Sequence, residues 1–207
     1  MSADGKIALP TGRQLRISCD LDIERMHKLR NECDAILVGI NTVLSDDPKL
    51  TVKKRYVSHP KQPLRVVLDR ECKIPTNAQI LNRSAKTLII TSKACDNQLT
   101  DDHVEIVKCS IDTDGYIDLE EVLALLHKKG VKKLLVEGGG TVIWNFLRKK
   151  FVDDLYLFIG PCIIGGKNTP TLADGIGITH PTELIKLRVL QLSRFGTGVL
   201  IHYRMEK

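Results

Sequence analysis

The sequence has few aromatic residues and no long apolar run. Aromatic side chains make up 4% of its 207 residues, against 43% for all apolar types, so aliphatic side chains must form most of the core. No segment approaches the ~20 apolar residues that a membrane-spanning helix needs. The N-terminal "MSADGKIALPTGR" also lacks the apolar centre of a secretory signal. We therefore expect a soluble, cytoplasmic protein.

Metal-binding patterns are missing as well. The six cysteines, at positions 19, 33, 72, 95, 109 and 162, form no C-x-x-C pair, and the six histidines form no i, i+4 pair. We predict no metal site, and we expect the cysteines to be free, buried thiols in a reducing compartment.

The net charge of +6 does not come from a long basic tract. Lysine and arginine occur in short groups at 53–55, 128–129, 132–133 and 148–150, with no aromatic residues interleaved as in a platform that stacks bases. These groups are typical of solvated helix faces, or they attract a small anion. A nucleic-acid-binding protein is an alternative that rests on the net charge alone.

Strand and helix patterns alternate along most of the chain. Short apolar runs at 34–40, 64–69, 86–91, 104–109 and 133–138 predict buried strands, and apolar residues at helical spacing predict helices over 20–33, 118–129 and 140–149. Asp118 is a natural N-cap for the second helix. After residue 152 the pattern predicts strands without helices, and "GTG" joins 184–195 to 198–204 as a hairpin. We predict an α/β fold in one domain, 1–207, with a mostly parallel central sheet, helices on both faces and an antiparallel C-terminal hairpin.

Three consecutive glycines stand where a predicted strand meets a predicted helix, in "KKLLVEGGGTVIWN" (132–145). The first N–H groups of a helix lack internal partners and carry the positive end of its dipole, and glycine lets an anion approach them closely. Gly138, Gly139 and Gly140 are thus a candidate phosphate-binding turn; a tight turn that needs positive φ is the other explanation. The P-loop ending and the G-x-G-x-x-G spacing are both absent.

A second polar cluster follows the 34–40 run, in "GINTVLSDDPKLTV" (39–52). Thr42 could donate its hydroxyl to a phosphate or ribose oxygen, and Asp46 would share a face with it if this stretch is helical. Asp47 precedes a proline, which favours extended backbone. A capped turn with solvated carboxylates is the alternative.

Taken together, "SADGKIA" (2–8), "HKLRNECDAILVGINTVLSDDPKLTV" (27–52), "LRVVLD" (64–69), "LLVEGGGTVIWNF" (134–146) and "GPCIIGGKNTPT" (160–171) resemble the riboflavin-biosynthesis reductases. The resemblance extends over nearly the whole chain. Within that group, the chain resembles the archaeal-type 2,5-diamino-6-ribosylamino-4(3H)-pyrimidinone 5′-phosphate reductases and the reductase half of bacterial bifunctional deaminase-reductases. It implies a dihydrofolate-reductase-like fold, a homodimer, NADPH as cofactor and hydride transfer to C1 of the ribosyl group.

The resemblance also implies site residues. Those matching cofactor contacts are Thr42, Asp46, Gly138, Gly139, Gly140, Thr141 and Val142, with Arg70, Ser92 and Lys93 toward the adenosine end, although Arg70 is as readily a surface residue. Those matching substrate contacts are Arg30, Leu50, Lys53 and Glu137. Glu137 and Asp46 are candidates for stabilising a cationic imine of the substrate, and Lys6 is a hypothetical proton donor.

Two departures from the family pattern shape the expectations. Family members carry an apolar strand before "ADGKIA", so this sheet is expected to lack its first strand if the chain starts at Met1. The deaminase signature, H-x-E followed by P-C-x-x-C, is absent, so the chain should reduce but not deaminate. Whether the substrate is the aminated or the deaminated pyrimidine stays open, and a pterin or dihydrofolate reductase of the same fold is the rival.

Overall fold

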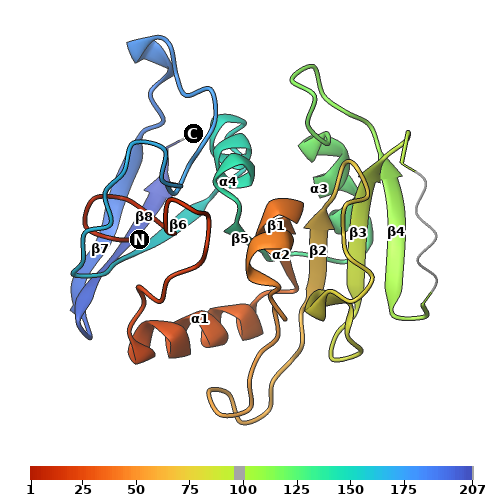
Figure 1. The fold of residues 1–207 in the computed structure, drawn as a ribbon, viewed down its shortest axis with the longest axis horizontal. Coiled ribbons are helices and arrows are strands. Elements are labelled where there is room, and N and C mark those ends of the chain that lie inside the picture. Colours follow the sequence, from red (N-terminus) through yellow and green to blue (C-terminus); the bar gives the residue numbers. More distant parts are fainter. Residues whose placement is uncertain (96–100, 207) are drawn as a thin grey trace. The chain divides into compact units, whose positions relative to one another are not determined.

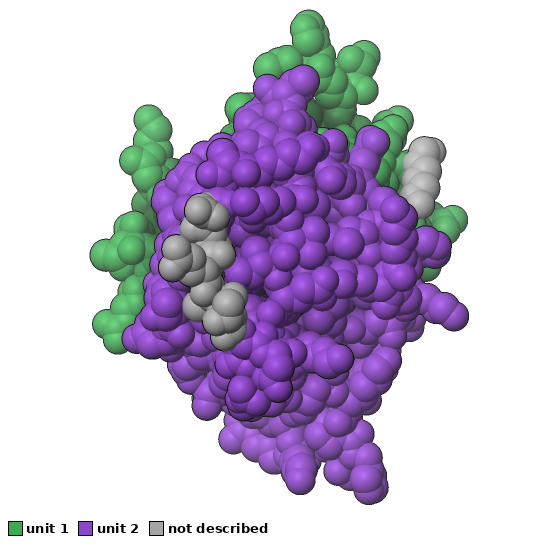
Figure 2. Space-filling model, turned by 90° about the vertical axis from the view of Figure 1, so that its right-hand side faces the viewer, with its two compact units in different colours: residues 1–25, 139–207 green, residues 26–138 purple. Residues whose placement is uncertain are grey.

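The computed structural model describes residues 1–95 and 101–206, and these fall into two compact units. One unit comprises residues 26–138, and the other comprises residues 1–25 and 139–207 (Figure 2). Each unit is described by itself. None of the helices within the described ranges is long and apolar enough to cross a membrane.

The unit of residues 26–138 is built on a five-stranded parallel sheet in the order β4-β3-β2-β1-β5 (Figure 1). The strands are β1 (Ala35–Gly39), β2 (Leu64–Leu68), β3 (Thr87–Ser92), β4 (Val104–Cys109) and β5 (Leu134–Gly138). All five predicted strands are therefore confirmed. The helices between them are α2 (Ile40–Asp46) and α3 (Leu119–Lys128), with a 3-10 turn η1 (Gln79–Leu81) and the C-terminal part of α1 (Asp20–Glu32).

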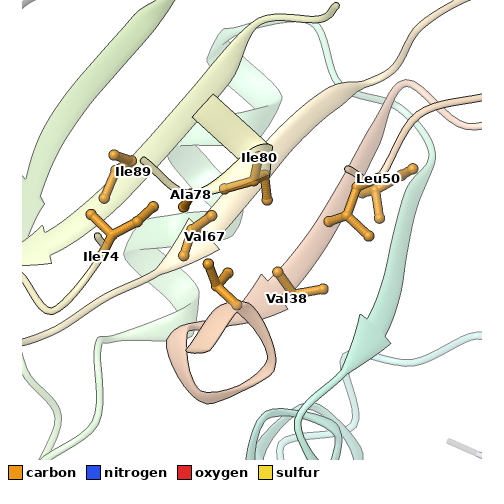
Figure 3. Packing of buried hydrophobic residues seen from close by; sticks show 9 residues of the cluster. Val38, Leu50, Val67, Ile74, Ala78, Ile80 and Ile89 are labelled. Atoms are coloured by element: carbon orange, nitrogen blue, oxygen red, sulfur yellow. The ribbon is translucent and has the colours of Figure 1, made fainter. Parts of the chain in front are cut away.

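Both faces of this sheet are buried, which explains the continuous apolar runs of its strands. On one face, Val38, Val67 and Ile89 pack with Val43 of α2 in a cluster that includes Ile80 (Figure 3). The alternating residues Leu37, Val66, Leu88 and Ile90 are also fully buried, so they form the opposite face. α3 buries Leu119, Val122 and Leu126, and the side chain of Asp118 caps it by accepting from the Glu120 N–H at 2.9 Å, as predicted.

The other unit contains α4 (Gly140–Arg148) and a three-stranded antiparallel sheet in the order β6-β8-β7. Its strands are β6 (Asp154–Ile159), β7 (Leu187–Phe195) and β8 (Gly198–Met205), with a short 3-10 turn η2 (Pro181–Glu183) before β7. β7 and β8 are the predicted hairpin, and the structure places them with β6 in a sheet of their own.

The N-terminal residues are fixed to the end of β6 within this second unit. The Met1 amino group donates to the Phe158 carbonyl at 2.6 Å, the Gly160 N–H donates to the Met1 carbonyl, and the Ala3 N–H donates to the Cys162 carbonyl. Lys6 forms an isolated antiparallel bridge with Thr171.

The expectation of free thiols is wrong for two of the six cysteines. Cys72 and Cys95 form a disulfide, whereas Cys19, Cys33, Cys109 and Cys162 are free. Burial raises the pKa of the Cys109 thiol to about 11, so that thiol is unreactive.

Candidate functional site

The order of the strands itself indicates where a ligand would bind. The chain places β2, β3 and β4 successively on one side of β1 and then returns to place β5 on the other side. In open α/β sheets, ligands bind outside the carboxyl ends of the strands at the point where this order reverses. Here that point lies between β1 and β5, where Val38 is paired with Gly138.

Thr42 and Gly138 meet at this point. Thr42 lies in α2, which begins directly after β1, and a Cβ on Gly138 would lie 3.2 Å from the Thr42 hydroxyl oxygen. Glycine at 138 therefore permits the close approach of Thr42 to the end of β5. Asp46 is also in α2, four residues after Thr42, so the predicted helical spacing of these two residues is confirmed.

Asp46 places a half-buried carboxylate at this edge. Among the described residues its hydrogen-bond partner is the neighbouring Ser45 hydroxyl, at 3.0 Å, and no cation lies against it. Burial raises the pKa of Asp46, and the Ser45 hydrogen bond opposes that shift only in part. A half-buried carboxylate without a counter-ion can accept a hydroxyl hydrogen bond or lie next to a cationic ligand group.

Each of the three glycines of the junction has its own structural role. Gly138 makes room for Thr42, as described above. Gly139 has φ +84°, a conformation that glycine adopts without strain. A Cβ on Gly140 would lie 2.6 Å from a carboxylate oxygen of Asp174 and 2.9 Å from the Thr171 carbonyl. The tight-turn explanation thus accounts for Gly139, and close packing accounts for the other two.

The start of α4 nevertheless keeps the features of an anion site. Gly139 is its N-cap residue, and no side chain caps the helix there. The first backbone N–H groups of α4 therefore need hydrogen-bond partners from outside the helix. The negative group observed nearby is Asp174, whose carboxylate accepts from the Thr171 N–H and hydroxyl.

Arg30 and Glu137 form a buried ion pair at the end of β5. The Arg30 guanidinium donates from Nε and Nη2 to the two carboxylate oxygens of Glu137, both at 2.6 Å, and Nη1 donates to the Thr51 carbonyl at 3.4 Å. The side chains are 19% and 9% exposed. Burial alone would lower the pKa of Arg30, but the charge and hydrogen bonds of Glu137 raise it above its ordinary value. The two hydrogen bonds from Arg30 thus fix the orientation of the Glu137 side chain.

Lys53 and Arg55 are basic residues near His27, which lies on α1 three residues before Arg30. The buried His27 ring stacks on Tyr56 with centroids 4.6 Å apart, and its Nδ1 accepts from the Lys53 N–H at 3.4 Å. Burial, followed by the positive charges of Arg30, Lys53 and Arg55, lowers the pKa of His27 to about 4. Three basic side chains thus lie near this ring, and basic side chains can attract an anionic group.

Unusual backbone conformations precede these residues. Leu50 is buried and has φ +46°, and Asp47 has φ +41°. The expected extended conformation of Asp47 is therefore wrong. Its N–H bonds to the Val43 carbonyl, and its carboxylate accepts from the N–H and side chain of Gln79, which holds it in the left-handed region. The same segment is held by the fully buried Arg65, whose guanidinium donates to the Lys49 carbonyl at 3.3 Å.

Arg70 and Ser92 come together at the ends of β2 and β3. The Ser92 N–H donates to the Arg70 carbonyl at 3.4 Å. The exposed Arg70 guanidinium bonds to the Gly115 carbonyl and to Glu71. These residues lie at the same edge of the parallel sheet as Thr42, because the carboxyl ends of parallel strands share one edge.

The comparisons with known proteins agree with this geometry. The family model described as the RibD C-terminal domain matches residues 1–201. A 2,5-diamino-6-ribosylamino-4(3H)-pyrimidinone 5′-phosphate reductase of Archaeoglobus fulgidus is 38% identical, with 100% of this chain and 95% of that protein covered. The protein of the same name from Methanothermobacter thermautotrophicus is 36% identical with the same coverage. The chain belongs to the RibD C-terminal domain family.

Solved structures of this family have the same fold. A deaminase and 5-amino-6-(5-phosphoribosylamino)uracil reductase of Thermotoga maritima is 26% identical with a TM-score of 0.79, and RibD of Acinetobacter baumannii is 21% identical with a TM-score of 0.84. The chain is covered to 99% and 100%, but it spans only 54% and 56% of those longer chains. The predicted fold class and family resemblance are thus confirmed.

Within the family framework, the predicted site residues are distributed over both units. Residues of the 26–138 unit that the structure brings together are Arg30 with Glu137, Thr42 with Gly138, and Arg70 with Ser92. In the other unit, the Lys6 ammonium donates to the Thr169 carbonyl at 3.3 Å, and Thr141 and Val142 form the first turn of α4. The roles assigned to all these residues stay predictions.

Sequence reasoning missed two residues of this region. His27 was assigned no site, although its i, i+3 spacing to Arg30 on α1 could have indicated a shared face. Asp174 gave no signal, because its approach to Gly140 depends on a long loop. A cavity of about 710 Å³ beside α4, lined by residues such as Trp144, Leu184 and Lys186, contains none of the predicted site residues.

Proposed function

We propose that the protein reduces the ribosylamino group of 2,5-diamino-6-ribosylamino-4(3H)-pyrimidinone 5′-phosphate to the ribitylamino product, a step of riboflavin biosynthesis. The observation that carries the proposal is the match, along the full chain, to two archaeal reductases of that name at 38% and 36% identity. The rival based on a pterin or dihydrofolate has no such relative among these matches.

We further propose NADPH as the cofactor, whose chemistry when bound is the donation of a hydride. Thr42, Asp46 and the turn from Gly138 to Val142 would hold it, since a side-chain-free turn with uncapped N–H groups suits a diphosphate. Arg70 would meet the adenosine end, where a guanidinium suits a 2′-phosphate.

The substrate side is assigned to residues of the 26–138 unit. Lys53, together with the nearby Arg55, would attract the 5′-phosphate, and the turn at Leu50, with its positive φ, would help position it. Glu137 would stabilise a cationic imine at C1, and the two hydrogen bonds from Arg30 would keep its side chain oriented. Lys6 is the proposed proton donor. We also propose a cytoplasmic homodimer that folds as a single reductase domain.

The test is a turnover assay with the purified full chain. The protein, NADPH and the aminated substrate should give loss of absorbance at 340 nm and a product two mass units heavier. The deaminated pyrimidine is the necessary comparison, because the Thermotoga relative is named for that substrate. Dihydrofolate is the negative control. Turnover of dihydrofolate alone, or of none of the three, would overturn the proposal.

A further inference from the structure

The disulfide between Cys72 and Cys95 joins two loops at the carboxyl edge of the parallel sheet. Cys72 lies in the loop after β2 and Cys95 in the loop after β3, with their Cα atoms 6.0 Å apart. That separation is within the normal range for disulfides. The crosslink therefore lies at the same edge of the sheet as the expected ligand point between β1 and β5.

The crosslinked loops also carry predicted cofactor residues. Arg70 is two residues before Cys72, and its carbonyl accepts from Ser92, three residues before Cys95. The start of the first loop is otherwise fixed by the buried Asp69 carboxylate, which accepts from the Lys73 and Ile74 N–H groups.

The backbone at Cys72 depends on a restraint. Its φ of +54° lies in the left-handed region, which is unfavourable for a residue with a side chain. The Cys72 N–H donates to the Asp69 carbonyl over a long distance of 3.4 Å, and the firmer bonds to the Asp69 carboxylate come from the next two residues. If the crosslink opens, we expect Cys72 to move toward negative φ and to shift Arg70, which is two residues before it.

The two sulfur atoms differ in access. Cys72 is partly exposed, whereas Cys95 is 7% exposed. An external thiolate would therefore attack the sulfur of Cys72 and release Cys95 as the leaving thiol. A second thiol of the reductant then resolves the mixed disulfide.

We infer that Cys72 and Cys95 are a reversible thiol–disulfide site that fixes the position of the Arg70 loop. Opening consumes a small dithiol and yields two protein thiols and the oxidised dithiol; closing consumes a small disulfide and yields two reduced thiols. The oxidised form is pre-organised and should bind NADPH more tightly, by on the order of 5-fold. This last consequence rests on the proposed function, whereas the fixing of the loop does not.

The site is tested first without any nucleotide. The full chain is equilibrated with oxidised glutathione or with dithiothreitol, and thiols are counted in denaturant: four are expected in the oxidised form and six in the reduced form. Hydrogen exchange of residues 69–75 should be faster in the reduced form, with exchange of α3 unchanged. Six thiols in both forms, or equal exchange in both, would overturn the inference.

NADPH titration then measures the consequence. The variant Cys72→Ser/Cys95→Ser should behave like the reduced protein under both conditions, and Cys19→Ser/Cys162→Ser, the matched control, should keep the response. Equal NADPH affinity of the oxidised and reduced wild type would refute the coupling to the cofactor. If NADPH binds to neither form, the proposed function fails, and the thiol count with hydrogen exchange still decides whether the crosslink fixes the loop.

Discussion

Replacing Arg30 with Met should destabilise the protein far more than removing an exposed lysine that also pairs with a carboxylate. Arg30 holds both oxygens of Glu137, and the two side chains are only 19% and 9% exposed. The matched control is Lys61, which pairs with Asp34 at 2.9 Å with side-chain exposures of 63% and 30%. The two pairs differ in burial and in the number of hydrogen bonds, so the control shows what an exposed, singly bonded pair contributes.

The magnitude follows from what the substitution leaves behind. Without Arg30, the Glu137 carboxylate stays buried and uncompensated, which costs about 3–5 kcal/mol. Removing Lys61 leaves a carboxylate that water can reach and that also accepts from the Lys132 and Lys133 N–H groups, so the cost should be about 0–1 kcal/mol. The double variant Arg30→Met/Glu137→Leu should recover most of the loss, because no charge is then left unpaired.

Urea unfolding followed by far-UV circular dichroism measures these differences as shifts of the midpoint at constant slope. The reasoning is refuted if Arg30→Met loses no more free energy of unfolding than Lys61→Met. It is equally refuted if the double variant is as unstable as the single one, because the loss would then come from packing and not from an unpaired charge.

Three further predictions concern other parts of the candidate site. Gly140→Ala should lower the free energy of unfolding by about 1–3 kcal/mol, because a Cβ would collide with Asp174. Adding Asp174→Ala should restore only part of this loss, because the Thr171 carbonyl remains close. An unchanged urea midpoint of Gly140→Ala would contradict the prediction. The stability of the wild type relative to His27→Gln should fall as the pH drops from 6.5 to about 4, by at most about 1.4 kcal/mol per pH unit. The reason is that the unfolded histidine binds its proton at a higher pH than the folded one. A stability difference that does not change with pH argues against a buried neutral ring. Lys6→Met should lower kcat with NADPH without a matching loss of stability, and unchanged turnover removes Lys6 as proton donor.

Much of the fold could be predicted because its signals are local. The central strands β1, β2 and β3 are apolar runs that are largely buried on both faces, and the Asp118 cap is a short-range hydrogen bond. The antiparallel part was less defined. A strand pattern identifies β6 as a strand, but which strand it pairs with depends on contacts between distant residues.

The parts of the candidate site that depend on local structure were also predictable. Thr42 and Asp46 share a helix, and the carboxyl ends of β1 and β5 meet because both strands are parallel neighbours. The left-handed backbone of Asp47 was not predictable, because it is held by the side chain of Gln79, some thirty residues later in the sequence. The Cys72–Cys95 disulfide was missed for the same reason, since two cysteines without a close spacing give no local signal of pairing.

The glycine junction shows why a sequence motif and its physical cause must be argued separately. An anion site would need glycine only where the ligand approaches, yet here each glycine already has a role in the protein itself: a tight approach of Thr42 to Gly138, positive φ at Gly139, and close packing of Asp174 on Gly140. Asp174 also places a carboxylate close to the first turn of α4, where a diphosphate would carry the same sign of charge. A dinucleotide that binds this turn must therefore compete with Asp174 or displace it, and the loop carrying Asp174 becomes part of the energetics of binding.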